Sequence, residues 1–370
     1  MKIVMATESF FPDLGGVEVF TARLATALLE RGHEVALITS RTGLTTCEED
    51  RWGAIPVHRM PFATTLDRCD YEGVITLRRR LAELKRALRP DVVHLNTSGK
   101  SLAFHLLTSR ATSAPSVLTV HWLPYGGGVD MQLCERALTA ADWIVAVTQA
   151  GLREAVQRSP DIAERTCVIY NSLPPVHVPP APLPGDPPRL LCIGRVENEK
   201  GFDVAIRALA LVRVRFPAAQ MTIAGEGTQR ERLEQLAAEL DLSEVIRFTG
   251  WIAPDDVPHL INAHTLVVMP SRYEPFGLVA LQAAQMGRPL VASRVPGLSE
   301  VVRDGDTAVL CTVDDAPAFA AAIVSLIEQP AAASAMGQRA RARVREAFSW
   351  DDHVAAYERL FRQVFSRTSD

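Results

Sequence analysis

Short apolar runs alternate with amphipathic segments along most of this chain. The runs at 2–6, 34–39 and 91–95 are mostly apolar and rich in β-branched residues, as expected of strands buried on both faces of a parallel sheet. Between the first two, residues 17–30 place apolar side chains at helical spacing. This alternation of strands and helices predicts βαβ units and an α/β fold.

The same rhythm restarts after residue 188, with predicted strands at 190–193, 220–224 and 265–269 and predicted helices at 202–215 and 229–240. The intervening segment 174–188 carries eight prolines and no periodic pattern, which is typical of a semi-rigid extended linker. A chain of 370 residues also exceeds the size at which single cores stop growing. We therefore expect one domain at 1–173, a linker at 174–188 and a second domain at 189–351.

Composition limits the classes of protein. With 48% hydrophobic and 22% charged residues the chain can bury ample core, and a net charge of −4 gives no reason to expect a nucleic-acid partner. The six cysteines form no CxxC pair, which favours a reducing compartment and no metal site. No apolar run reaches the length of a membrane span, and the first residues are too short a run for a signal peptide. We expect a cytoplasmic protein.

The segment 74–89 combines an apolar stripe with many cations. Its leucines recur at helical spacing, and arginines and Lys85 occupy the other positions. Such a helix is usually packed on a core with its charges in solvent, but a basic amphipathic helix can also lie on anionic lipid. A weak peripheral contact with the inner membrane face is the second interpretation.

The most informative stretch runs from Thr265 to Gly287, where a predicted strand, a tight loop and a helix follow one another. Ligands of open α/β sheets bind beyond the carboxyl ends of the strands, and free amides at the start of the next helix attract anions. Glu274 lies in that loop. An acidic residue near a helix start also stabilises the helix by about 0.3–1 kcal/mol, so the carboxylate alone does not define a site.

Three further loops follow predicted strands. Arg195 and Lys200 lie behind Gly194, between a strand and a helix, where exposed surface charges would look the same. Gly15 and Gly16 precede the first helix and permit close backbone approach to a phosphate, although a simple tight turn is the alternative. No GxGxxG follows the first strand, which argues against a dinucleotide-binding dehydrogenase.

His121 directly follows the predicted strand at 117–120. A histidine at a strand end can bond a sugar hydroxyl or a phosphate, and a satisfied structural histidine is the alternative.

The order and spacing of these pieces resemble the family 4 retaining glycosyltransferases. The likeness is carried by a glutamate followed eight positions later by a second polar residue, here Glu274 and Gln282, and by the segments 194–201, 224–227 and 248–251. It implies that Glu274 contacts a hydroxyl of the donor sugar. The family has a second glutamate at the position of Gln282, which is uncharged here but can still hydrogen-bond the ribose.

The resemblance also assigns roles to the other loops. Arg195 and Lys200 would hold the donor diphosphate, and His121 would face the donor sugar. The remaining donor-binding positions that it implies are Gly15, Gly16, Gly194, Gly225, Trp251 and the backbone amides of Phe276, Gly277 and Leu278.

The fold implied by the resemblance is α/β with GT-B architecture, in which two Rossmann-like doubly wound domains face each other across a cleft and a last helix, 352–370, packs back on the first. The implied activity is retaining transfer of a hexose-type sugar from a nucleoside-diphosphate sugar, UDP-linked or GDP-linked, to a hydroxyl of a glycan, a lipid or a small molecule. No cofactor or metal is implied, and Asp304-Gly305-Asp306 reads as a turn. A sugar-nucleotide-binding subunit without turnover and a sugar-nucleotide epimerase remain alternatives.

Overall fold

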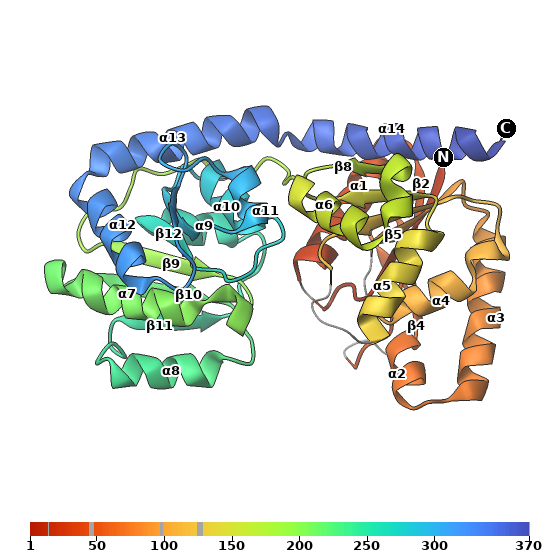
Figure 1. Ribbon diagram of the computed structural model, residues 1–370, viewed down its shortest axis with the longest axis horizontal. Coiled ribbons are helices and arrows are strands. Elements are labelled where there is room, and N and C mark those ends of the chain that lie inside the picture. The colour runs from red at the N-terminus through yellow and green to blue at the C-terminus, as the bar shows by residue number, and fades with distance from the viewer. Residues whose placement is uncertain (14, 44–47, 97–98, 124–128, 370) are drawn as a thin grey trace. The chain divides into compact units, whose positions relative to one another are not determined.

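The computed structural model describes residues 1–13, 15–43, 48–96, 99–123 and 129–369 (Figure 1). The chain divides into two compact units. The first consists of Met1–Tyr170 together with Asp351–Asp370, and the second of Asn171–Trp350. The proline-rich segment 174–188, which we predicted as a linker, falls within the second unit.

The first unit is built on a sheet of order β3-β4-β2-β1-β5-β6-β7-β8. Its strands are β1 (Lys2–Thr7), β2 (Glu34–Ser40), β3 (Glu49–Trp52), β4 (Ile55–Met60), β5 (Val92–Asn96), β6 (Ser116–Val120), β7 (Trp143–Ala146) and β8 (Thr166–Val168). Strand β3 pairs antiparallel with β4, and the other described pairs are parallel. Strand order reverses between β1 and β5, so polar loops after these strands lie where ligands of such sheets bind.

The helices of this unit are α1 (Gly16–Glu30), α2 (Phe62–Asp67), α3 (Tyr71–Leu88), α4 (Ser101–Leu107), α5 (Val129–Ala140), α6 (Gln149–Arg158) and the short 3₁₀ helices η1 (Ser109–Ala111) and η2 (Pro160–Arg165). From Asp351 onward the last helix, α14 (Trp350–Ser369), belongs to the same unit. Tyr357 and Phe361 are fully buried, with ring centroids 5.3 and 5.4 Å from that of His94.

Helix α3 corrects one sequence-based assignment. Asp70 caps its start by accepting from the Gly73 amide, and Leu77 and Leu81 are buried as the apolar stripe predicts. Lys85, which we placed among the solvated cations, is only 3% exposed. That prediction is wrong because the neighbouring helix α4 and the turn after it cover this lysine and supply oxygen acceptors for its ammonium.

The second unit holds a parallel sheet of order β11-β10-β9-β12-β13-β14. The strands are β9 (Arg189–Ile193), β10 (Gln220–Ala224), β11 (Ile246–Gly250), β12 (Leu266–Met269), β13 (Leu290–Ser293) and β14 (Val309–Cys311). Its helices are η3 (Asn198–Lys200), α7 (Phe202–Arg215), α8 (Arg230–Glu239), α9 (Val257–Asn262), α10 (Leu278–Gln285), α11 (Pro296–Val301), α12 (Ala316–Glu328) and α13 (Pro330–Ala347). The order reverses between β9 and β12, which places the loops after these two strands side by side.

Both units therefore have the doubly wound α/β arrangement that the sequence predicts. In the described part of the chain, no single helix has both the length and the apolar run needed to cross a membrane, although the bent pair formed by 316–328 and 330–367 meets the two criteria together.

Candidate active site

The loops after β9 and β12 bring two predicted site residues into contact. Lys200 Nζ lies 2.7 Å from Glu274 Oε2, and the two side chains are 19% and 11% exposed. The family resemblance implied contacts with different parts of a donor, the diphosphate for Lys200 and the sugar for Glu274. The structure joins them as an ion pair at the point where strand order reverses.

Glycines make this close packing of loops possible. Gly201 has φ +64°, and a Cβ built there would lie 2.1 Å from the carbonyl oxygen of Pro270. On the other side of the loop, a Cβ on Gly297 would lie 2.4 Å from the Glu274 carbonyl oxygen. Any larger side chain at either position would displace the backbone that carries Lys200 or Glu274.

Arg272 connects the same two loops through hydrogen bonds and ion pairs, a role that the sequence analysis did not predict. Its amide donates to the Glu199 carbonyl at 2.8 Å, and its guanidinium donates to the Asn198 carbonyl at 2.7 Å. The guanidinium also pairs with Asp203 at 2.8 Å and with Asp314 at 2.7 Å. The only sequence signal was its place two residues before Glu274.

The pKa of the Asp203 carboxyl is governed by burial and by its contact with Arg272. Burial alone would raise the pKa of its carboxyl, but the hydrogen bond and the charge of Arg272 outweigh burial and hold that pKa below its ordinary value. The carboxylate therefore stays ionised and keeps the guanidinium in place at neutral pH.

Helix α10 begins directly behind Glu274. Gly277 precedes it with φ +111°, a conformation that favours glycine, and the amides of Leu278 and Val279 lie in the first turn, where helical amides have no intrahelical acceptor. Such amides suit an anionic or polar oxygen. Gln282 lies one turn further along the same face and is half-buried.

The Phe276 side chain is buried and packs in the core. It is only 3% exposed, and its ring centroid lies 5.9 Å from that of Phe348. The ring anchors the loop in the core, so a ligand can meet only the backbone at this position.

The loops after β9, β10 and β11 pack closely at the same edge of the sheet. Gly194 and Gly225 have φ of +144° and +141°, and a Cβ on Gly225 would lie 1.9 Å from the Gly194 carbonyl oxygen. Trp251, just after β11, is 51% exposed. Arg195 is also exposed and pairs with Glu199 at 2.8 Å. The predicted donor-binding residues of this unit thus gather at the carboxyl edge of the sheet.

His121, a predicted site residue of the first unit, lies in a group of neutral side chains. His121 Nε2 lies 2.5 Å from Asn96 Oδ1, the Asn96 amide donates to Thr21 Oγ1, and the Phe20 ring meets His121 edge-on at 5.5 Å. Burial, with a smaller effect from the charge of His353, lowers the pKa of His121 to about 4. At pH 7 this side chain therefore acts as a hydrogen-bonding group and not as a cation.

Gly15 caps the start of helix α1, and Gly16 is its first residue. Gly15 is extended, with φ −155°, and the space beside it is occupied by the carboxylate of Glu18, which accepts from Ser9 Oγ. A phosphate at this helix start would have to displace Glu18. His121, Gly15 and Gly16 belong to the first unit and the other predicted site residues to the second, and each group is placed within its own unit.

The acidic turn at 304–306 is tied to arginines. Asp304 pairs with Arg294, and Asp306 pairs with Arg339 at 2.6 Å. Across the residues that the structure describes, no group of three or more histidine, cysteine, aspartate or glutamate side chains could hold a metal ion.

Two doubly wound units with polar loops at the carboxyl ends of their strands define a GT-B glycosyltransferase architecture. The family model described as "Glycosyl transferases group 1" matches residues 177–343, and that described as "Glycosyltransferase Family 4" matches residues 14–176. The chain belongs to this family of group 1, family 4 glycosyltransferases, as its sequence motifs indicate.

Relatives of known name agree with this assignment. A glycogen synthase of Mycobacterium tuberculosis is 32% identical over 98% of this chain and 94% of its own length. Among solved structures, sucrose-phosphate synthase from Thermosynechococcus elongatus superposes with a TM-score of 0.85 at 23% identity, covering 99% of both chains. Anabaena HepE in complex with UDP-glucose superposes with a TM-score of 0.79 at 22% identity, covering 99% of this chain and 100% of its own.

Proposed function

We propose that this glycosyltransferase moves a hexose-type sugar from a nucleoside-diphosphate sugar to a hydroxyl acceptor, with retention of configuration and without a metal ion. The observation that carries the proposal is the Lys200–Glu274 pair beside the start of α10. It provides one cation, one carboxylate and oriented amides within a single loop cluster. The solved complex of HepE with UDP-glucose favours a UDP-linked donor over a GDP-linked one.

The chemistry follows from where charge develops. When the bond between sugar and diphosphate breaks, negative charge grows on the leaving diphosphate, and a fixed cation about 4 Å away contributes roughly 4 kcal/mol at an effective dielectric near 20. Lys200 and Arg195 supply such cations. Glu274 accepts a hydrogen bond from a hydroxyl of the donor sugar and so orients the sugar for transfer.

Retention requires that the acceptor approach on the face from which the diphosphate departs. A phosphate oxygen of the leaving group then takes the proton of the acceptor hydroxyl, and no nucleophile from the protein is needed. His121 is neutral at pH 7, which suits a hydrogen bond to a sugar hydroxyl better than binding of a phosphate. No cofactor is required.

The acceptor is a hydroxyl of a glycan, a lipid or a small molecule. The relative named glycogen synthase makes a glucan the first acceptor to test.

The test is transfer by the purified full chain from a panel of UDP- and GDP-sugars, with EDTA present and with glucan oligomers as acceptors. We expect transfer from a UDP-sugar, and NMR of the product should show the anomeric configuration of the donor. Inverted product would overturn retention, and activity lost to EDTA but restored by manganese would overturn metal independence. Donor binding without transfer would favour the binding subunit, and interconversion of the donor sugar without acceptor would favour the epimerase.

A further inference from the structure

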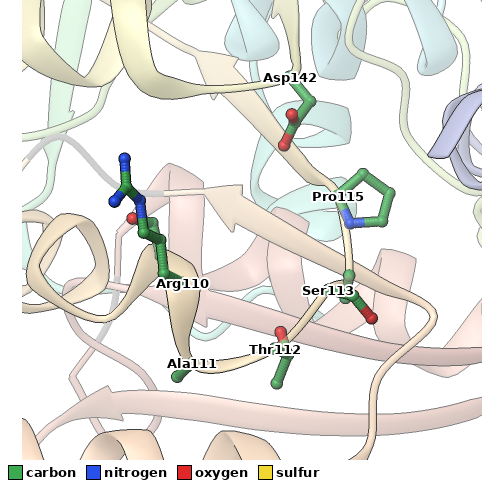
Figure 2. A pocket seen from close by; sticks show the side chains of 8 residues that line it. Arg110, Ala111, Thr112, Ser113, Pro115 and Asp142 are labelled. Carbon is green, nitrogen blue, oxygen red and sulfur yellow. The ribbon is translucent and has the colours of Figure 1, made fainter.

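The first unit contains a polar cavity away from the strand ends that carry the predicted site residues. It has a volume of about 240 Å³, and its polar lining includes Lys85, His105, Ser109, Arg110, Thr112 and Asp142. An outer depression of about 510 Å³ shares Ser109, Arg110, Thr112 and Asp142 with it. Figure 2 shows Arg110, Thr112 and Asp142 around this depression.

The cavity lies at the opposite edge of the sheet from His121. Ser116, the first residue of β6, lines it, and Asp142 immediately precedes β7. These are amino ends of parallel strands, whereas His121 follows the carboxyl end of β6. The cavity is therefore not part of the sugar-transfer site.

His105 gives the first indication of a ligand. Its side chain is buried, the residue being 2% exposed, and neither ring nitrogen has a hydrogen-bond partner among the described residues. A neutral imidazole has one N–H donor and one acceptor nitrogen, and leaving such groups buried and unpaired is unfavourable. Because His105 is one of the residues that line the cavity, a molecule bound there is a candidate partner for these nitrogens.

Lys85 gives a second, independent indication. Its ammonium donates to two neutral oxygens, Thr108 Oγ1 at 3.0 Å and the His105 carbonyl at 3.4 Å. Three N–H donors are available, so one remains, and within the described residues no carboxylate forms an ion pair with it. Burial lowers the pKa of Lys85 to about 8, so the amine is still largely charged at pH 7.

The charges of the lining favour an anion over water. Arg110 stands exposed at the mouth, and with Lys85 it gives the lining two cations against the one carboxylate of Asp142, whose Oδ2 accepts from the amide and the hydroxyl of Ser116 at 2.7 and 2.8 Å. Water could bond the His105 ring but would leave the charge of Lys85 unneutralised, which is costly in a buried place. A phosphoryl group has enough acceptor oxygens for Lys85, His105 and Arg110 together.

We propose that this cavity binds the phosphoryl group of a small soluble ligand, with Lys85, His105 and Arg110 donating to its oxygens. The site lies apart from the strand ends that bear the sugar-transfer residues, so the ligand is an effector and not a substrate.

The direct test follows the ring resonances of His105 by NMR while inorganic phosphate is added to the full chain at pH 7 and constant ionic strength. His105→Gln assigns the signals. We expect a saturable shift, and Arg110→Ala and Lys85→Met should each weaken binding roughly tenfold, the loss typical of one charge-assisted hydrogen bond. Because Arg110 is exposed, its removal should not impair folding.

Arg86→Ala is the matched control, since Arg86 adjoins Lys85 in α3 but is exposed and does not line the cavity. It should leave the titration unchanged. So should Lys200→Ala, which separates this site from any binding of phosphate to the donor loops. Absence of a shift, or equal affinity in Arg110→Ala and the wild type, would overturn the proposal. Binding of phosphatidic acid vesicles without any response to inorganic phosphate would assign the cavity to a lipid head group and would overturn it as well.

Discussion

The two units differ in the groups that surround their predicted site residues. In the second unit the polar groups are charged and paired, as in Lys200–Glu274 and in Arg272 with Asp203. In the first unit the predicted site residue His121 is neutral and hydrogen-bonded to Asn96, and the carboxylates of Glu8 and Glu18 accept hydrogen bonds near the same strand ends. Preorganised charge is valuable where charge develops in a reaction, whereas neutral donors and acceptors suit hydroxyl groups. The fixed cations of the second unit support the proposed placement of the leaving diphosphate there.

The sharpest test of this division is the Lys200–Glu274 pair. Lys200→Ala removes a cation from the diphosphate, and we expect the turnover number to fall on the order of 10²–10³, as for loss of a comparable preorganised donor. Glu274→Ala should also lower the turnover number, because the donor sugar loses its orienting group. Steady-state kinetics at saturating donor measures both. A larger loss in His121→Ala than in Lys200→Ala would reverse the roles of the units.

Arg195 is the second cation proposed to hold the diphosphate, and its guanidinium pairs with Glu199 in the structure. If the guanidinium leaves Glu199 to bind the diphosphate, Arg195→Ala should lower the turnover number by the same order of 10²–10³. The matched variant Glu199→Gln should keep a turnover number near that of the wild type. A similar loss in both variants would mean that the ion pair itself holds the loop.

We expect the first unit to lose stability at a higher pH than the second unit when the solution is acidified. Burial lowers the pKa of His94 to about 3 and those of His121 and His353 to about 4. Since an unfolded histidine has a pKa near 6.5, the unfolded chain binds more protons below that pH, and the first unit loses stability as pH falls from about 6.5 toward 4. One pKa unit corresponds to about 1.4 kcal/mol, so a single such histidine contributes roughly 3 kcal/mol across this window.

The second unit should resist the same change. The pKa of Asp203 is held below its ordinary value, so its contribution is present above about pH 4 and is lost only in stronger acid. His264, which also has a lowered pKa, adds a smaller loss. Hydrogen exchange measured by mass spectrometry and corrected for intrinsic rates should show that, as the pH is lowered, the first unit opens at a higher pH than the second unit. His353→Gln should reduce the difference, and simultaneous opening of both units would contradict it.

The success of sequence-based prediction differed between elements for physical reasons. Buried parallel strands such as β1 and β9 are continuous apolar runs, so their pattern is plain. Strand β3 was missed because Glu49, Asp50 and Arg51 are exposed and show no apolar alternation. Lys85 was misplaced because a lysine counts as polar in any periodic pattern, and only the fold brings it to Thr108.

The candidate site shows the same limit. Its loops were recognisable as segments, but the contact between Lys200 and Glu274 depends on β9 lying beside β12, and no local pattern specifies that order. Arg272 was overlooked because its partners, Asp203 and Asp314, lie far from it in sequence.

Variants of Gln282 test whether donor binding in the second unit depends on a negative charge at this position. It is half-buried in the first turns of α10, and we expect Gln282→Ala to raise the Michaelis constant for the donor several-fold with little change in the turnover number, because ribose binding is the same in ground and transition states. Gln282→Glu, which adds the charge that the family carries here, should lower the Michaelis constant. Equal losses in turnover number and efficiency in Gln282→Ala would place this residue in the chemical step instead.

The last prediction concerns the surface of the first unit, where helix α3 carries several exposed cations. The leucines of that helix face the core, so a lipid contact would have to use Tyr71 and Ile75, which are 82% and 68% exposed, with Arg78 and Arg79 beside them. An exposed cation contributes about 1 kcal/mol to binding at an anionic surface, so Arg78→Glu with Arg79→Glu should weaken sedimentation with phosphatidylserine vesicles at least tenfold. Arg136→Glu with Arg153→Glu, two exposed positions on α5 and α6, is the charge-matched control. Equal binding by the two double variants would remove α3 as a membrane contact and leave its cations a solvent-exposed face.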